Sequence, residues 1–118
     1  MTEENEIYTK RRLFPRFKVE TYFRPSHPFA QKQQILDIGL GGMRVYGNKA
    51  PRVGKEMDIK LFLPNEKIID VRVRIAWVNA LPPGSEAPYD IGYEFVDLSP
   101  EMLKEIKAML ENAPSVEE

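Results

Sequence analysis

The sequence predicts a mainly β (all-β class) protein, a six-stranded antiparallel barrel followed by one C-terminal α-helix. Three observations lead to this class. Apolar and polar residues alternate through most of positions 17–97, which is the period of half-buried strands. Proline and glycine clusters interrupt the alternation at short intervals, as antiparallel turns do. After position 98 the apolar period changes to that of a helix. A barrel is expected because an open sheet of this size would leave a bare hydrophobic face and exposed edges.

The first two strands are expected on either side of a proline-rich loop. Residues 17–24 alternate, and their inner positions are Phe17, Val19, Thr21 and Phe23. Residues 25–28 contain two prolines and a serine, which predicts a loop. The second strand is predicted over residues 30–38, polar at its start and apolar at its end.

A glycine-rich segment, residues 37–42, comes next. Its three glycines, Gly39, Gly41 and Gly42, predict a tight bend or a bulge inside a strand-like run. A plain hairpin corner and a close approach of a ligand to the backbone both explain such a bend. The segment considered alone leaves both explanations open.

The middle of the chain carries the clearest alternation. Residues 51–63 predict a strand, residues 64–66 a turn, and residues 69–77 the longest strand. The alternation places Trp77 on the same inner face as Ile75. A core role for Trp77 is therefore favoured over presentation of its ring to a ligand.

The chain ends with a surface loop at residues 81–88, a last strand at residues 89–97 and a helix at residues 100–112. Ser99 is suited to cap the helix, and Pro100 suits its first turn. The stripe at helical spacing consists of Met102, Leu103, Ile106, Met109 and Leu110. This stripe is expected to close one end of the barrel, with a dimer contact as the alternative use.

Length and composition predict a single domain. Of the 118 residues, we expect 1–9 to be a flexible tail, 10–112 the domain and 113–118 a disordered tail. The absence of cysteine excludes disulfides, thiolate metal sites and thiol nucleophiles. The acidic N-terminus lacks an apolar run, and no window approaches the ~18 apolar residues of a membrane span. We therefore expect a cytoplasmic protein with no membrane contact.

Charge is unevenly distributed, although the formal net charge is −1. Residues 10–32 carry seven basic residues and one acidic residue, whereas residues 86–118 carry nine acidic and two basic ones. Three of the basic residues, Arg11, Arg12 and Arg16, form a cluster beside Pro15, whose ring partly fixes the backbone. Because guanidinium groups bind phosphates and lie over bases, the cluster predicts a compact polyanionic ligand. A solvated basic strand edge is the alternative.

The sequence contains no motif typical of an enzyme. Gly-x-Ser-x-Gly, the phosphate-binding Gly-Lys-Ser/Thr and His-Glu-x-x-His are all missing. The single histidine, His27, lies in a proline-rich loop without a nearby serine or cysteine nucleophile. We therefore expect a receptor and not an enzyme, with no cofactor.

Two motifs make this chain resemble a PilZ domain. That family carries Arg-x-x-x-Arg just before its barrel and Asp/Asn-x-Ser-x-x-Gly on the following strands. Here residues 12–16 match the first motif, preceded by an additional Arg11, and residues 37–42 match the second. Residues 91–97 also resemble the last strand of the family, so the resemblance covers nearly all of residues 9–112.

The resemblance implies binding of cyclic di-GMP, a bacterial second messenger. Arg12 and Arg16, supported by Arg11, would grip its phosphates and contact guanine. Asp37 would accept hydrogen bonds from the guanine N–H groups. Gly42 would allow the backbone to approach the base closely.

Gly39 departs from the family pattern, because a serine usually stands there. The missing hydroxyl would contribute roughly 0.5–1.5 kcal/mol if it bonded the ligand. Binding should therefore be weaker by about two- to tenfold but not abolished. The expected site also includes Trp77, as a ring that would stack on a purine.

The role implied is a receptor whose arginine segment reorders over the ligand and signals to an effector protein in motility or biofilm control. We expect a monomer or homodimer that binds no nucleic acid. The alternative is a degenerate PilZ domain that acts as a protein–protein adaptor without nucleotide. Degenerate members typically lose the arginines, and this chain keeps all three. A third reading, an oligonucleotide-binding barrel, would need several outward aromatic residues among lysines and arginines.

Overall fold

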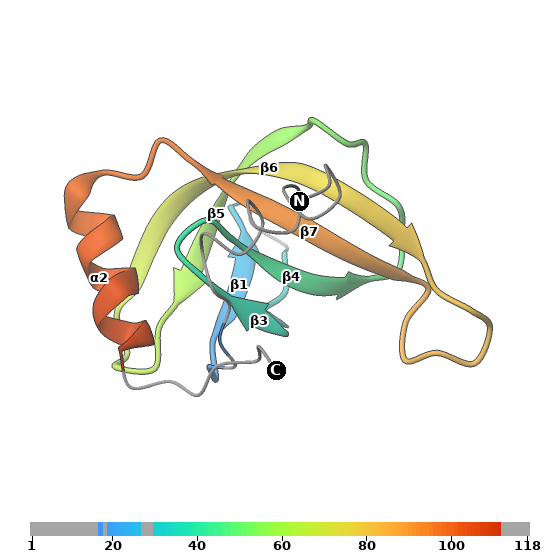
Figure 1. Cartoon of the computed structure of the whole chain (residues 1–118), viewed down its shortest axis with the longest axis horizontal. Helices are drawn as coiled ribbons and strands as arrows, with labels where there is room; N and C mark the ends of the chain where they lie inside the picture. The colour runs from blue at the N-terminus through green and yellow to red at the C-terminus, as the bar shows by residue number, and fades with distance from the viewer. Residues whose placement is uncertain (1–16, 18, 27–29, 112–118) are drawn as a thin grey trace, which may run out of the picture.

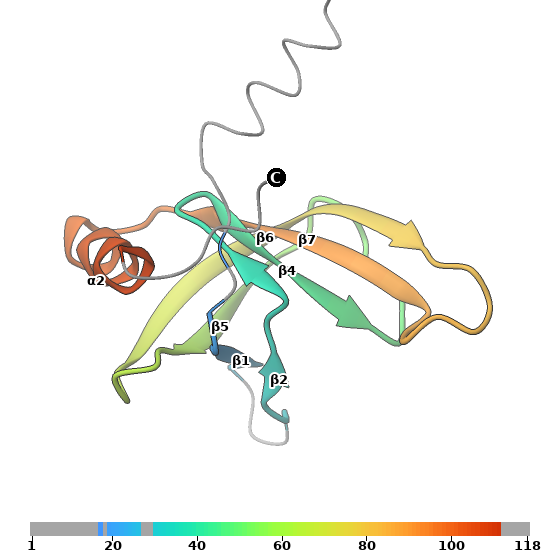
Figure 2. The ribbon, with the colours of Figure 1, turned by 60° about the horizontal axis from the view of Figure 1, so that its bottom comes forward.

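The computed structural model describes residues 17, 19–26 and 30–111. In this part of the chain, seven antiparallel strands form one sheet in the order β2-β1-β5-β6-β7-β4-β3. The sheet curls into a half-barrel with α2 at one end and the loop between β6 and β7 at the other (Figures 1 and 2). The elements are β1 (Tyr22–Pro25), β2 (Gln33–Gln34), β3 (Asp37–Ile38), β4 (Gly42–Gly47), β5 (Glu56–Phe62), β6 (Ile68–Ala80), β7 (Tyr89–Val96) and α2 (Pro100–Leu110). The mainly β class with a terminal helix is confirmed, with seven strands in place of six.

The additional strand arises where the predicted strand 30–38 divides into β2 and β3. The Ile35 N–H donates to the Thr21 carbonyl over 3.1 Å, whereas the Leu36 N–H donates to the Arg44 carbonyl over 2.8 Å. The chain thus passes from one edge of the sheet to the other within two residues. The prediction of one continuous strand was wrong because its backbone groups pair with two different partners.

An isolated bridge between Phe17 and Ile38 also joins the chain before β1 to β3 at one edge of the sheet. The Phe17 N–H donates to the Ile38 carbonyl over 2.7 Å, and the Ile38 N–H donates to the Phe17 carbonyl over 2.9 Å. The chain before β1 is thereby fixed beside β3. Figure 2 shows how far the sheet curls to bring its two edges together.

The first strand is shorter than predicted and ends later. Thr21 and Phe23 are buried as expected, but β1 begins only at Tyr22. Pro25 pairs with Ile59 as the last residue of β1, so the predicted loop began one residue too early. Proline is tolerated there because β2 no longer pairs with this end of β1.

The hydrophobic core lies on the concave face of the sheet. Apart from Trp77, the predicted inward positions of β5, β6 and β7 are buried in this core or packed against it. The ring centroids of Phe23 and Tyr93 lie 5.6 Å apart. The expected turn at residues 64–66 is present, with the Glu66 N–H donating to the Leu63 carbonyl over 3.0 Å. The alternation therefore located the core of these strands correctly.

Helix α2 closes one end of this core, as predicted. The Ser99 hydroxyl accepts the Met102 N–H over 3.1 Å, and Pro100 opens the first turn. Ile106 is fully buried and Leu110 nearly so, whereas Leu103 is 41% exposed and does not belong to the buried stripe. Within the described residues, no helix is long and apolar enough to cross a membrane.

A β-bulge interrupts the pairing of β6 with β7. Ile75 pairs with Tyr93 and Trp77 pairs with Gly92, so Ala76 is the extra residue. The additional residue reverses the alternation, and Trp77 turns to the outer face while Val78 packs against the core. The prediction of a core role for Trp77 was wrong for this reason.

Candidate functional site

Three cross-strand rows of outward residues meet on the convex face of β4, β7 and β6. The middle row runs from Arg44 through Gly92 to Trp77. The rows on either side consist of Gly42, Glu94 and Arg74, and of Tyr46, Asp90 and Asn79. The centre of the middle row is a glycine, and the indole of Trp77 occupies the space directly above its backbone.

A hollow of about 760 Å³ lies over these rows. Its volume falls within the range of roughly 300–1,000 Å³ that is typical of ligand pockets. Its lining consists of Gly41, Gly42, Met43, Arg44, Ala76, Trp77, Asn79, Asp90, Gly92, Tyr93 and Glu94. The hollow therefore combines one aromatic ring with charged groups of both signs.

Arg44 joins two carboxylates at this hollow. Its Nη1 donates to Asp37 Oδ2 over 2.7 Å, and its Nε donates to Asp90 Oδ1 and Oδ2 over 3.0 and 3.2 Å. Burial lowers the pKa of Arg44, but the hydrogen bonds to Asp90 and Asp37 outweigh this effect and raise the pKa above its ordinary value. Arg44 thus remains charged and holds the buried Asp37 carboxylate next to the hollow.

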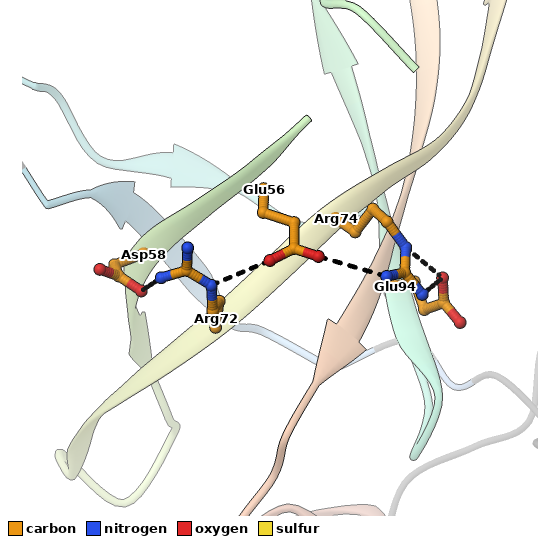
Figure 3. Close-up of polar contacts among 5 residues, drawn as sticks. All are labelled: Glu56, Asp58, Arg72, Arg74 and Glu94. Carbon is orange, nitrogen blue, oxygen red and sulfur yellow. Dashed lines mark hydrogen bonds and ion pairs between the residues drawn. The ribbon is translucent and has the colours of Figure 1, made fainter. Parts of the chain in front are cut away.

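On its other side, the hollow is bordered by a row of alternating acidic and basic side chains on the convex face, which we call the charged ladder (Figure 3). The ladder consists of Asp58, Arg72, Glu56, Arg74 and Glu94. Arg74 Nη2 donates to Glu94 Oε1 over 2.9 Å, and Arg74 Nη1 lies 3.3 Å from Glu56 Oε2. Arg72 continues the ladder to Glu56 and Asp58. Glu94 is consequently both the last group of the ladder and part of the hollow.

The glycine-rich bend is a hairpin between β3 and β4. The Gly39 N–H donates to the Gly42 carbonyl over 2.9 Å, and Asp37 pairs with Arg44 across the two strands. A Cβ atom at Gly42 would overlap the Tyr93 carbonyl group of β7. Gly42 is therefore required by the close approach of β4 to β7 within the protein itself.

The structure brings part of the expected site together. Trp77 and Gly42 line the hollow, and Asp37 is attached to it through Arg44. Gly39 is buried in the hairpin turn and is not part of the lining. The predicted residues Arg11, Arg12 and Arg16 lie outside the described residues.

Sequence reasoning predicted only Gly42 and Trp77 among the residues that line the hollow, and it missed Arg44, Asp90, Gly92 and Glu94 in particular. One signal was present, because Gly92 interrupts an otherwise regular strand, and such a glycine often marks a close approach. Arg44 and Asp90 carried no comparable signal, since their meeting depends on the register between β4 and β7. Among the described residues, no group of three metal-ligating side chains is placed to hold a metal ion.

Comparison with protein families matches residues 10–112 to the model of the PilZ domain. Solved structures share the fold. YcgR of Escherichia coli in complex with c-di-GMP superposes with a TM-score of 0.67 at 14% identity, covering 85% of this chain and 44% of that one. The complex of K. pneumonia MrkH with c-di-GMP gives a TM-score of 0.68 at 22% identity, covering 85% and 51%.

The inhibitor of motility MotI/DgrA of Bacillus subtilis is also similar, with a TM-score of 0.69 at 15% identity over 85% of this chain and 49% of that one. The present chain therefore spans about half the length of these three proteins. Comparison with curated proteins gave no match. At these identities the structural similarity establishes the fold.

Proposed function

Because this chain belongs to the PilZ domain family, we propose that it is a receptor for cyclic di-GMP. The observation that carries the proposal is the second family motif, whose Asp37 is held by Arg44 beside a hollow that Trp77 lines. Two of the matched structures, those of YcgR and MrkH, are described as complexes with this ligand.

The described half of the site is suited to guanine. The guanine N1–H and N2–H₂ groups are donors, and the carboxylates of Asp37 and Asp90 are acceptors. The outward ring of Trp77 offers a surface on which a purine stacks. Arg44 pairs with both carboxylates and neutralises part of their negative charge. The two side chains therefore offer hydrogen-bond acceptors without a large net negative charge.

The phosphates require cations from elsewhere in the chain. Among the described residues that line the hollow, Arg44 is the only cation, and it already holds two carboxylates, while Asp90 and Glu94 are negative. We therefore assign the phosphates to Arg12 and Arg16, with Arg11 in support. On this proposal the arginine segment reorders over the ligand and forms a surface for an effector protein in motility or biofilm control.

Isothermal titration of the full chain with cyclic di-GMP tests the proposal. We expect heat of binding with tens of micromolar protein. Cyclic di-AMP is the matched ligand, because adenine lacks the N1–H and N2–H₂ donors that the carboxylates would accept. Absence of heat with cyclic di-GMP, or equal affinity for both ligands, would contradict the proposal.

Replacing Arg16 with Ala is expected to abolish measurable binding, because a charge-assisted contact to phosphate is lost. Arg52→Ala is the control, since Arg52 is exposed on the loop between β4 and β5 and does not line the hollow. Equal affinities of the two variants would sink the assignment of the phosphate site.

The same titration separates the receptor from the alternative adaptor. A folded protein that binds neither dinucleotide would instead be a PilZ domain that acts through protein contacts alone. The expectation that no nucleic acid is bound has no support from the comparisons, because one matched MrkH structure is described as a transcription regulatory factor dependent on c-di-GMP. Titration with duplex DNA in the presence of cyclic di-GMP addresses this partner class.

A further inference from the structure

We infer that Gly92 and the bulge at Ala76 are positioning residues that hold the indole of Trp77 in the floor of the hollow. Their effect on the ligand rests on the proposed function. The position of the ring, however, is a property of the protein alone and is measured without ligand.

The bulge is needed because of the spacing along β6. Ile75 points into the core and is 1% exposed, and Trp77 is two residues further on. In a regular strand, residues two apart share a face. With Ala76 as an extra residue, Trp77 pairs with Gly92 and takes the outer face, while Val78 returns to the core. Bulges re-aim side chains in this way beside functional sites.

Gly92 provides the space that the redirected ring occupies. A Cβ atom at Gly92 would overlap the Cε2 and Nε1 atoms of the Trp77 indole and lie 2.7 Å from its Cζ2 atom. The ring therefore lies directly above the backbone of β7 at the centre of the hollow. Any side chain at position 92 displaces it.

Gly92 differs in this respect from the other glycine of the hollow. At Gly42 an added Cβ would overlap the backbone of Tyr93, so a substitution there disturbs the sheet itself. At Gly92 the overlapping atoms belong to a half-buried side chain that lies on the surface. Gly92→Ala is thus expected to keep the fold and to move the ring.

The experiment uses Trp77 as its own reporter, because it is the single tryptophan of the chain. In Gly92→Ala we expect emission at longer wavelength and stronger quenching by acrylamide, with an unchanged circular dichroism spectrum. The control is Gly47→Ala, whose added methyl group would meet the Ile91 side chain and not the indole. Emission that is unchanged in Gly92→Ala, or shifted equally in both variants, overturns the inference.

Affinity for cyclic di-GMP provides the second readout. Removing an aromatic side chain on which a base stacks lowers the affinity by about five- to a hundredfold. We expect a loss of this size in Gly92→Ala and in Trp77→Ala, and no additional loss in the double variant. Multiplicative losses, or an unaffected affinity in Gly92→Ala, would show that Gly92 does not act through the ring.

The outcomes distinguish this inference from the proposed function. If the wild type binds no cyclic di-GMP, the proposed function fails, and the emission of Gly92→Ala still decides where the ring lies. If Gly92→Ala fails to fold, adding Trp77→Ala should restore folding because the overlap is removed. A double variant that also fails to fold overturns the inference.

Discussion

Gly39 is the position of the second motif at which this chain lacks the family's hydroxyl. We predict that Gly39→Ser tightens cyclic di-GMP binding by about two- to tenfold, because a hydroxyl bonded to the ligand contributes about 0.5–1.5 kcal/mol. Isothermal titration measures the affinity, and thermal unfolding shows whether the buried turn accommodates the larger residue. Weaker binding by a variant with unchanged thermal stability would contradict this estimate.

Trp77 shows what single residues reveal before a structure is known. Its aromatic type suggested either a core or a stacking role, and strict alternation from Ile75 selected the core. The face that Trp77 takes depends on the bulge at Ala76. Nothing in the sequence marks this alanine as a bulge, which becomes visible only in the register of β6 against β7. In contrast, Asp37 and Gly42 were identified from a contiguous motif, which requires no knowledge of register.

At the scale of elements, the charged ladder joins β5, β6 and β7 across the convex face (Figure 3). The hydrogen bond from Arg72 lowers the pKa of Glu56 in the folded state. A carboxyl whose pKa is lowered by folding contributes stability at pH values above its unfolded pKa of about 4.3. This contribution is lost as the pH falls through the folded value.

We therefore predict that Glu56→Gln unfolds at a lower temperature than the wild type at pH 7 and that the difference shrinks as the pH is lowered below about 4. The difference should also shrink at high salt, because the ladder is exposed. Asp70→Asn, which removes an isolated exposed pair with Lys60, is the control and should have a smaller effect. A difference independent of pH would exclude the ladder as its cause.

The elements themselves were predictable to different degrees. Strands β5 and β6 were located from their long alternation, and α2 was located from Ser99, Pro100 and its apolar period. The segment that became β2 and β3 was not, because Ile35 and Leu36 alternate like any strand while their N–H groups turn to opposite edges. In a strand without a bulge, the local pattern indicates which face a residue takes, but it does not indicate which strand the residue pairs with.

At the scale of the whole molecule, α2 is the element that covers the open end of the core. We predict that Ile106→Ala destabilises the protein by about 2–5 kcal/mol, because a fully buried side chain leaves a cavity between helix and sheet. Leu103→Ala, on the same helix but 41% exposed, should change stability far less. Urea unfolding of both variants measures the difference, and equal effects would contradict the assigned packing.

On the proposed function, the bridge between Phe17 and Ile38 has a consequence for ligand binding. Phe17 directly follows Arg16 in the chain, and Ile38 directly follows Asp37. The covalent chain and two hydrogen bonds thus tether the arginine motif to the aspartate motif. A ligand held by one motif meets the other at a high effective concentration, as in a chelate with a very short linker. On that proposal, two weak half-sites would together bind one dinucleotide tightly, because part of the entropic cost of bringing them together is met when the protein folds.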